Sequence, residues 1–187
     1  MDMVIVKVDA PQYDVEGKLY GNVQLSKVID GYNAPLTGGN IVDLVSKGYY
    51  YGKNITRSDG FAVQTGDNDP EGSVHGYVPA GATEERKIPM EISLKGEEDL
   101  INGASSEDEG KGYAAATLPF QNNLASFQFF WLLFKSDLTP VDKSLLDGRY
   151  SCFGYTVGNP DVLMGVKEGG VIKKATVVTG KENLKQT

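Results

Sequence analysis

A single histidine and a single cysteine limit the chemistry that the side chains of this 187-residue chain can perform. His75 has no second histidine beside it, so a serine–histidine–aspartate site or a histidine metal cluster is not expected. Cys152 alone can form neither an intramolecular disulfide nor a zinc site of several cysteines. The stretch from Asp67 to Gly72 imitates half of a calcium loop, but Val78 stands where the closing glutamate ligand belongs. We therefore predict no metal ion and no cofactor.

Charge and hydropathy exclude two further classes of partner. The chain has 18 basic and 25 acidic residues, a net charge of −7, whereas a nucleic-acid-binding protein needs a basic face. The longest apolar run, Phe129 to Phe134, is far shorter than the roughly 18 residues of a membrane-spanning helix. An acidic stretch at about residues 96–112 is expected to be a solvated loop insertion. A docking surface for a basic partner is the alternative.

The elements that must hold any site are mostly strands. Glycine and other turn residues interrupt the chain about every ten positions, which is typical of an all-β protein with few helices. Alternation predicts strands that include Met3 to Val8, Gly21 to Val28, Phe61 to Gln64 and Ile88 to Leu94. Three more are expected at Phe127 to Phe134, at Tyr150 to Val157 and, closing the chain, at Val171 to Thr179.

Two short helices interrupt the strands. The spacing of Ile41, Leu44 and Val45 predicts a helix over residues 34–46, with Pro35 in its first turn and Gly48 as its stop. Asn159-Pro160 is typical of a second helix start. We expect a mainly β fold, a closed antiparallel eight-stranded β-barrel with two short α-helices as caps, in a single domain over residues 1–187.

Three separated motifs resemble the cyclophilin family of peptidyl-prolyl cis-trans isomerases. They are RSDGFAVQTGD (Arg57 to Asp67), FQFFWLLF (Phe127 to Phe134) and LLDGRYSCFG (Leu145 to Gly154). They follow the family order at nearly the family spacing, and the likeness covers about Met3 to Gly180. The resemblance implies a cyclophilin-like barrel that grips proline-containing peptide segments of client proteins and isomerises the X-Pro bond.

The resemblance also assigns roles to residues. Arg57 corresponds to the donor that acts on the prolyl amide, and Gln64 to a second catalytic position that helps to hold Arg57 and the peptide. Phe61, Phe130 and Leu146 match the apolar pocket of the proline ring. The full set of expected substrate-binding residues is Phe61, Ala62, Thr117, Gln128, Phe130, Leu145, Leu146 and Tyr150.

Several positions depart from the common family pattern. The Arg-to-Phe segment is one residue shorter, and its Asp59 is placed to pair with Arg57 and divert its donors. Ala62 replaces a methionine on the pocket floor, which predicts a wider pocket. The groove segment becomes Thr117-Leu118-Pro119, and Tyr150 replaces a histidine at the rim. Leu145 replaces a tryptophan, which predicts weak binding of cyclosporin.

Within the family the chain looks most like the divergent cyclophilins of the thylakoid lumen, through DGYNAPLTGGNIVDLV (Asp30 to Val45) and RSDGFAVQTGD. This predicts a chloroplast thylakoid-lumen protein, although the chain opens without a targeting leader and a cytoplasmic location is the alternative. Two functions are predicted beside each other. One is a monomeric prolyl isomerase that assists protein folding. The other is a weakly active or inactive binding module, a scaffold or chaperone in the assembly of photosynthetic complexes. A barrel for a small apolar ligand is a third, weaker alternative, because the large aromatics of Phe127 to Phe134 predict a filled interior.

Overall fold

The computed structural model describes residues 3–13, 16, 18–66, 77–89, 91, 113–116, 127–133, 150–157 and 160–184. Eight strands, one α-helix and two 3₁₀-helices lie in these ranges. Their bounds, in chain order, are β1 (Met3–Tyr13), β2 (Leu19–Asp30), α1 (Pro35–Ser46), β3 (Ile55–Ser58), β4 (Ala62–Thr65), β5 (Tyr113–Ala116), β6 (Phe129–Leu132), β7 (Ser151–Val157), η2 (Pro160–Gly165), β8 (Lys174–Thr179) and η3 (Lys181–Asn183).

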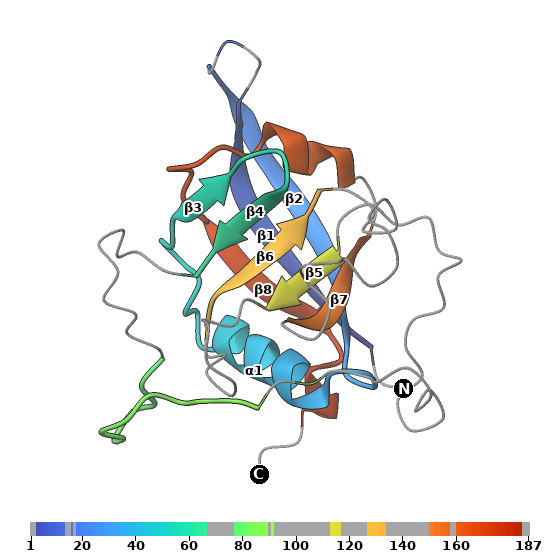
Figure 1. Ribbon diagram of the computed structural model, residues 1–187, viewed down its shortest axis with the longest axis vertical. Helices are drawn as coiled ribbons and strands as arrows, with labels where there is room; N and C mark the ends of the chain where they lie inside the picture. Colours follow the sequence, from blue (N-terminus) through green and yellow to red (C-terminus); the bar gives the residue numbers. More distant parts are fainter. Residues whose placement is uncertain are drawn as a thin grey trace.

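The eight strands form one antiparallel sheet in the order β3-β4-β6-β5-β7-β2-β1-β8 (Figure 1). The long β1–β2 hairpin pairs without interruption from Met3 opposite Asp30 to Gln12 opposite Gly21. Alternate β1 residues Val6, Val8 and Ala10 are buried, as the period of two in the sequence predicts. The fold is therefore mainly β with one α-helix.

The first and last strands of this order approach each other just outside their paired segments. Asn54 and Val171 form an isolated antiparallel bridge. Two backbone hydrogen bonds flank it, from Gly52 N–H to the carbonyl of Ile172 (2.9 Å) and from Ile172 N–H to the carbonyl of Lys53 (2.9 Å). The residues that precede β3 and β8 are thus tied together at one point.

Helix α1 begins at Pro35, as predicted, and its first turn receives an acidic partner from far along the chain. Both carboxylate oxygens of Glu91 accept N–H groups there, from Leu36 at 2.8 Å and from Thr37 at 2.7 Å. These donors have no partner within the helix, so the carboxylate satisfies them and complements the helix dipole. The helix ends before Gly48, whose φ of 72° lies in the left-handed region that glycine tolerates.

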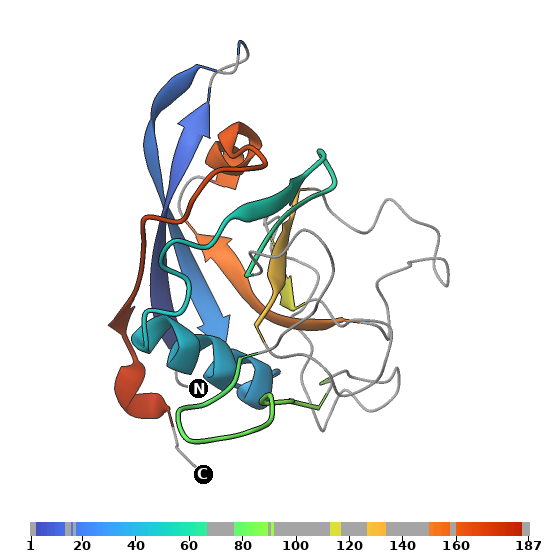
Figure 2. The same ribbon diagram turned by 90° about the vertical axis from the view of Figure 1, so that its left-hand side faces the viewer.

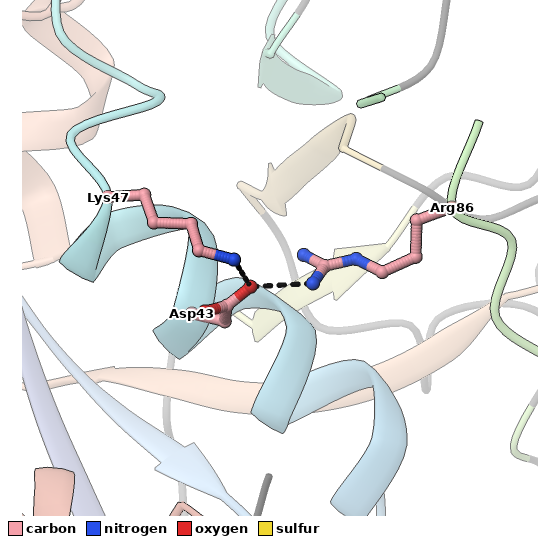
Figure 3. A network of polar contacts seen from close by, with 3 residues as sticks. All are labelled: Asp43, Lys47 and Arg86. Carbon is pink, nitrogen blue, oxygen red and sulfur yellow. Dashed lines mark hydrogen bonds and ion pairs between the residues drawn. The ribbon is translucent and has the colours of Figure 1, made fainter. Parts of the chain in front are cut away.

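The segment of residues 77–89 also crosses α1 and is anchored by an ion-pair network. Figure 3 shows Asp43 of the helix between Lys47 and Arg86. Its Oδ2 lies 2.8 Å from Lys47 Nζ and 2.5 Å from Arg86 Nη1. Burial raises the pKa of Asp43, but the hydrogen bonds from Lys47 and Arg86 outweigh it and hold that pKa below its ordinary value. The Arg86 guanidinium also lies 4.8 Å from the Tyr77 ring centroid. Helix α1 and this segment thus cover one end of the sheet, whereas η2 lies at the other (Figure 2).

Two sequence predictions about elements need correction. The second cap, η2, is a 3₁₀-helix of six residues and not an α-helix. The backbone carbonyl of Leu163, whose side chain is buried, accepts the N–H of Val166 three residues later, which is the hydrogen-bond pattern of a 3₁₀ turn. In the predicted strand Ile88 to Leu94, Ile88 is a single bridge residue and Pro89 is not in a strand. Residues 90 and 92–94 lie outside the described ranges.

The main apolar core, called the inner core below, lies between the sheet and α1. Its largest fully buried side chains include Trp131, Tyr50 and Phe153. Lys27 of β2 is also buried there, 1% exposed, with its amine 3.6 Å from the Phe129 ring centroid and 3.8 Å from that of Trp131. In the described part of the chain, no helix is long and apolar enough to cross a membrane.

Candidate functional site

Arg57 and Gln64, the two predicted catalytic residues, face each other across the β3–β4 hairpin. The register pairs Arg57 with Gln64 and Ser58 with Val63. The connecting turn uses Asp59 and Gly60, whose φ of 79° is one that glycine accepts readily. The Asp59 carboxylate accepts N–H groups of Phe61 and Ala62, both at 3.0 Å, and so closes the turn on itself.

The sheet extends this pair into a row of four strands. Gln64 of β4 pairs with Phe130 of β6, and Phe130 pairs with Ala115 of β5. Directly opposed residues of antiparallel strands point to the same face. Arg57, Gln64 and Phe130 therefore lie on one face, although more than 60 residues separate Gln64 from Phe130 in the sequence.

A second apolar cluster lies on this face, opposite the inner core. Ala62, Phe130 and Leu132 are buried in it, and the half-buried Phe61 and Tyr150 pack against them. The Phe130 and Tyr150 rings meet edge to face, with centroids 5.2 Å apart and an interplanar angle of 90°. These five residues are called the outer cluster below. Four of them, all but Leu132, are among the predicted substrate-binding residues.

Leu132 is the member of the outer cluster that sequence reasoning missed. It pairs directly with Ala62 across β4 and β6 and is 6% exposed. Its side chain therefore lies beside the small Ala62, where the sequence predicted a wider pocket. The alternation of β6 was the available signal, because Phe130 and Leu132 stand two residues apart and share a face.

The two glutamines hold each other beside this cluster. The Gln64 side-chain Nε2 donates to the side-chain Oε1 of Gln128 at 2.9 Å, across 64 positions of sequence. Gly66 makes the close approach of their strands possible. A Cβ there would lie 2.6 Å from the Phe127 carbonyl oxygen, and the φ of 115° also excludes most side chains. Gln64 and Gln128, each predicted as a site residue, are thus brought together beside Arg57, which pairs with Gln64 across the hairpin.

The Arg57 guanidinium is paired with Asp59, as the sequence predicted. Nε donates to Oδ2 at 2.6 Å, and Nη2 lies 2.5 Å from the same oxygen. The Ala62 N–H, together with Arg57, holds the pKa of Asp59 below its ordinary value, so the pair is ionic at neutral pH. The guanidinium carbon lies 5.4 Å from the Phe61 ring centroid. The cation therefore stands against the edge of the outer cluster.

Three predicted residues lie outside the described ranges, namely Thr117, Leu145 and Leu146, and so does the acidic stretch at 96–112. Within the described ranges, no three histidine, cysteine, aspartate or glutamate side chains gather as metal ligands would. The arrangement instead places an apolar cluster, with Phe61 and Tyr150 as its partly exposed rings, beside a pair of amides and one cation on one face. Such a set can bind an apolar ring and donate hydrogen bonds to a nearby carbonyl or amide.

Comparison with known proteins gives consistent results. The family model described as "Cyclophilin type peptidyl-prolyl cis-trans isomerase/CLD" matches residues 13–184. The chloroplast peptidyl-prolyl cis-trans isomerase CYP38 of Arabidopsis thaliana is 44% identical over 170 residues, 84% of this chain and 38% of the relative. A putative thylakoid lumen peptidyl-prolyl cis-trans isomerase of Synechocystis is 40% identical over 173 residues, 86% of this chain and 45% of the relative. The chain thus spans less than half the length of either relative.

Solved structures share the fold. A crystal structure of a Cryptosporidium parvum cyclophilin-type peptidyl-prolyl cis-trans isomerase aligns with a TM-score of 0.63 at 17% identity, covering 95% of this chain and 98% of that one. A second structure of that protein, in the presence of the dipeptide Ala-Pro, aligns with a TM-score of 0.58 at 18% identity, covering 91% and 99%.

Proposed function

Because this chain belongs to the cyclophilin-type peptidyl-prolyl cis-trans isomerase family, we propose that it accelerates cis–trans isomerisation of X-Pro bonds in client proteins. One observation carries the proposal. The sheet register brings Arg57, Gln64 and Phe130 onto one face, beside an apolar cluster that is separate from the inner core. Proline-containing peptide segments are the substrate class that fits a cation next to an apolar surface.

The chemistry needs neither a nucleophile nor a cofactor. Amide resonance gives peptide rotation a barrier of about 18–20 kcal/mol, so uncatalysed X-Pro isomerisation takes tens to hundreds of seconds. Resonance is lost in the twisted amide, and its nitrogen becomes a better hydrogen-bond acceptor. A donor such as Arg57 that bonds the twisted form more strongly than the planar form lowers the barrier. Phe61, Phe130 and Leu132 would hold the proline ring while the preceding carbonyl rotates.

A binding module is the second candidate. The pairing of Arg57 with Asp59 favours it, because it engages two donor nitrogens of the cation. In this function the same face would grip proline-containing segments as a scaffold or chaperone, with little turnover. The names of the chloroplast and thylakoid-lumen relatives support a lumenal site of action. Photosynthetic complexes would be the clients of such a module.

Further properties belong to the proposal. We infer a single cyclophilin-like domain, because the family match spans 172 residues from 13 to 184. We infer a closed barrel, because Asn54 and Val171 bridge the two ends of the strand order. We also expect a monomer with weak affinity for cyclosporin, the latter from Leu145 in place of a tryptophan.

Exchange NMR on a short X-Pro peptide tests the isomerase. We expect the wild type to accelerate exchange, and Arg57→Ala to lose about one to two decades of rate, the worth of a charged hydrogen bond made in the transition state. Lys174→Ala on β8 is the matched control, because it removes an exposed cation from a strand that contributes no residue to the outer cluster and should leave the rate unchanged.

Three outcomes separate the two candidates. Loss of rate in Arg57→Ala with an intact fold supports the enzyme. Peptide-induced shifts at Phe61 and Phe130 without acceleration by the wild type contradict the enzyme and support the binding module. An absence of both acceleration and shifts contradicts both functions.

A further inference from the structure

Asp59 connects the Arg57 cation to the backbone that carries the outer cluster. Its Oδ2 accepts from Arg57 Nε at 2.6 Å and lies 2.5 Å from Nη2. Its Oδ1 accepts the N–H groups of Phe61 and Ala62, both at 3.0 Å. One carboxylate therefore binds the guanidinium with one oxygen and the start of β4 with the other.

This anchoring distinguishes the pair from an ordinary surface ion pair. The side chains of Arg57 and Asp59 are 46% and 44% exposed, and a long arginine side chain at such exposure has many accessible rotamers. Here the carboxylate is itself fixed by two backbone donors, so it holds the guanidinium in one place. That place is 5.4 Å from the Phe61 ring centroid, at the edge of the outer cluster.

The contact also selects which donors of the cation it occupies. A guanidinium carries five N–H groups. Asp59 engages Nε and Nη2, so it does not engage the two N–H groups of Nη1. A hydrogen-bond acceptor on a peptide bound at the outer cluster can therefore bond the Nη1 donors of a guanidinium that Asp59 already holds in place.

We propose that Asp59 is a positioning residue that holds the Arg57 guanidinium at the edge of the outer cluster with Nη1 directed to the substrate. The role in turnover rests on the isomerase function proposed above. Asp59 touches neither the prolyl amide nor the ring and acts through Arg57. The inference is opposite to the sequence prediction that Asp59 diverts the donors of Arg57, and the two make opposite forecasts for the same variant.

Asp59→Asn is the informative change. Its side-chain oxygen still accepts the Phe61 and Ala62 N–H groups, so the turn is kept, while the charge that holds Arg57 is lost. We expect kcat for an X-Pro peptide to fall about two- to fivefold, the effect expected for a partly exposed pair, with KM little changed. Asp9→Asn on β1, which removes a carboxylate charge at an exposed hydrogen bond from Gln24 and keeps the accepting oxygen, is the matched control and should keep the wild-type rate.

Comparing the effect of Asp59→Asn in the presence and absence of Arg57 distinguishes a positioning role of Asp59 from a structural role. In an Arg57→Ala background, Asp59→Asn should have no further effect on kcat. A second readout is the Arg57 Nε–H signal in nitrogen-15 NMR, expected to be protected from solvent exchange in the wild type and to lose protection in Asp59→Asn. A rate that rises in Asp59→Asn overturns the proposal, as does an equal fall with and without Arg57.

Failure of the proposed function gives a different result. If the wild type does not accelerate exchange, the isomerase is contradicted, and the Nε–H signal decides the positioning by itself. Protection in the wild type that disappears in Asp59→Asn supports the positioning of Arg57. Equal exchange in both proteins overturns it.

Discussion

Strands β4 and β6 build two apolar clusters, one on each face, and the clusters differ in what surrounds them. On the inner face, Phe129 packs against several rings, with centroid distances of 5.3 Å to Tyr50, 4.8 Å to Trp131 and 6.0 Å to Phe153. On the outer face, Phe130 meets Tyr150 and neighbours the paired amides and the Arg57 cation. The polar groups beside the outer cluster are partly exposed, whereas Lys27 and the Tyr50 hydroxyl on the inner face are buried.

The comparison separates stability from recognition within a single strand. Aromatic side chains stabilise a protein wherever they are buried, so the hydrophobicity of Phe127 to Phe134 does not by itself identify a site. The amide pair and the Arg57 cation beside the outer cluster distinguish the two faces, because they can hydrogen-bond to a bound peptide, whereas a peptide has no access to the inner core. The two faces should therefore respond differently to matched substitutions.

The largest difference is expected between Phe129→Ala and Phe130→Ala. Phe129→Ala should lower the free energy of unfolding by about 3–5 kcal/mol, because it removes the central ring of the inner core. Phe130→Ala should lower it less, since fewer rings contact it, but should abolish the chemical-shift changes caused by an X-Pro peptide. Urea unfolding and peptide titration measure the two effects. Equal destabilisation with peptide binding retained in both variants would contradict the comparison.

Substitution of Lys27, a polar side chain within the inner core, should have a smaller effect on the free energy of unfolding and should raise it instead of lowering it. Burial lowers the pKa of its amine well below the ordinary value of 10.5. Lys27→Met removes a buried amine and should raise the free energy of unfolding by about 1–3 kcal/mol near neutral pH. Prolyl isomerisation should not change. Lys174→Met, at an exposed position of β8, is the control and should leave stability nearly unchanged.

The pH dependence of this gain follows from the sign of the shift. Above the lowered pKa of folded Lys27 and below 10.5, the unfolded chain binds more protons at this site, so wild-type stability rises with pH. The advantage of Lys27→Met should therefore shrink as the pH rises toward 10.5. An advantage that stays constant over this window would show that Lys27 is charged in the folded protein.

The smallest effect is expected for the amide pair. Gln128→Leu removes the 2.9 Å bond from Gln64 and should lower kcat/KM by about two- to tenfold, the worth of one net hydrogen bond. Stability should change little, because both amides are only partly buried. Gln24→Leu on β2, which loses an exposed 3.1 Å bond to Asp9, is the matched control. A similar loss of kcat/KM in Gln24→Leu would show that the effect is not specific to the outer face.

Much of the architecture was predictable because its causes are local. The alternation of Val6 and Val8 indicated β1, and Pro35 and Gly48 marked the limits of α1. The type of the second helix was not predictable. The same Asn-Pro start and apolar spacing fit an α-helix or a 3₁₀-helix, and the packing of Leu163 and Val166 over only six residues decided between them.

The sequence predicted which residues belong to the candidate site, but not which of them lie beside one another in the sheet. The motifs indicated Arg57, Gln64 and Phe130, but their common row depends on the register of strands far apart in the chain. Leu132 was missed because β6 is wholly apolar: its spacing puts Leu132 on the face of Phe130, but nothing local shows that this is the face of the site. The helix partner Glu91 was missed for a similar reason, since 54 positions separate it from Thr37.

The sequence by itself determined the family, the strands and the chemistry available, because composition, periodicity and motif order are properties of neighbouring residues. It also put Asp59 within reach of Arg57, two positions away. The tertiary structure decided which apolar residues belong to which face, and it buried Lys27 beneath Phe129 and Trp131. These outcomes depend on strand register and packing, which join residues that no local pattern relates.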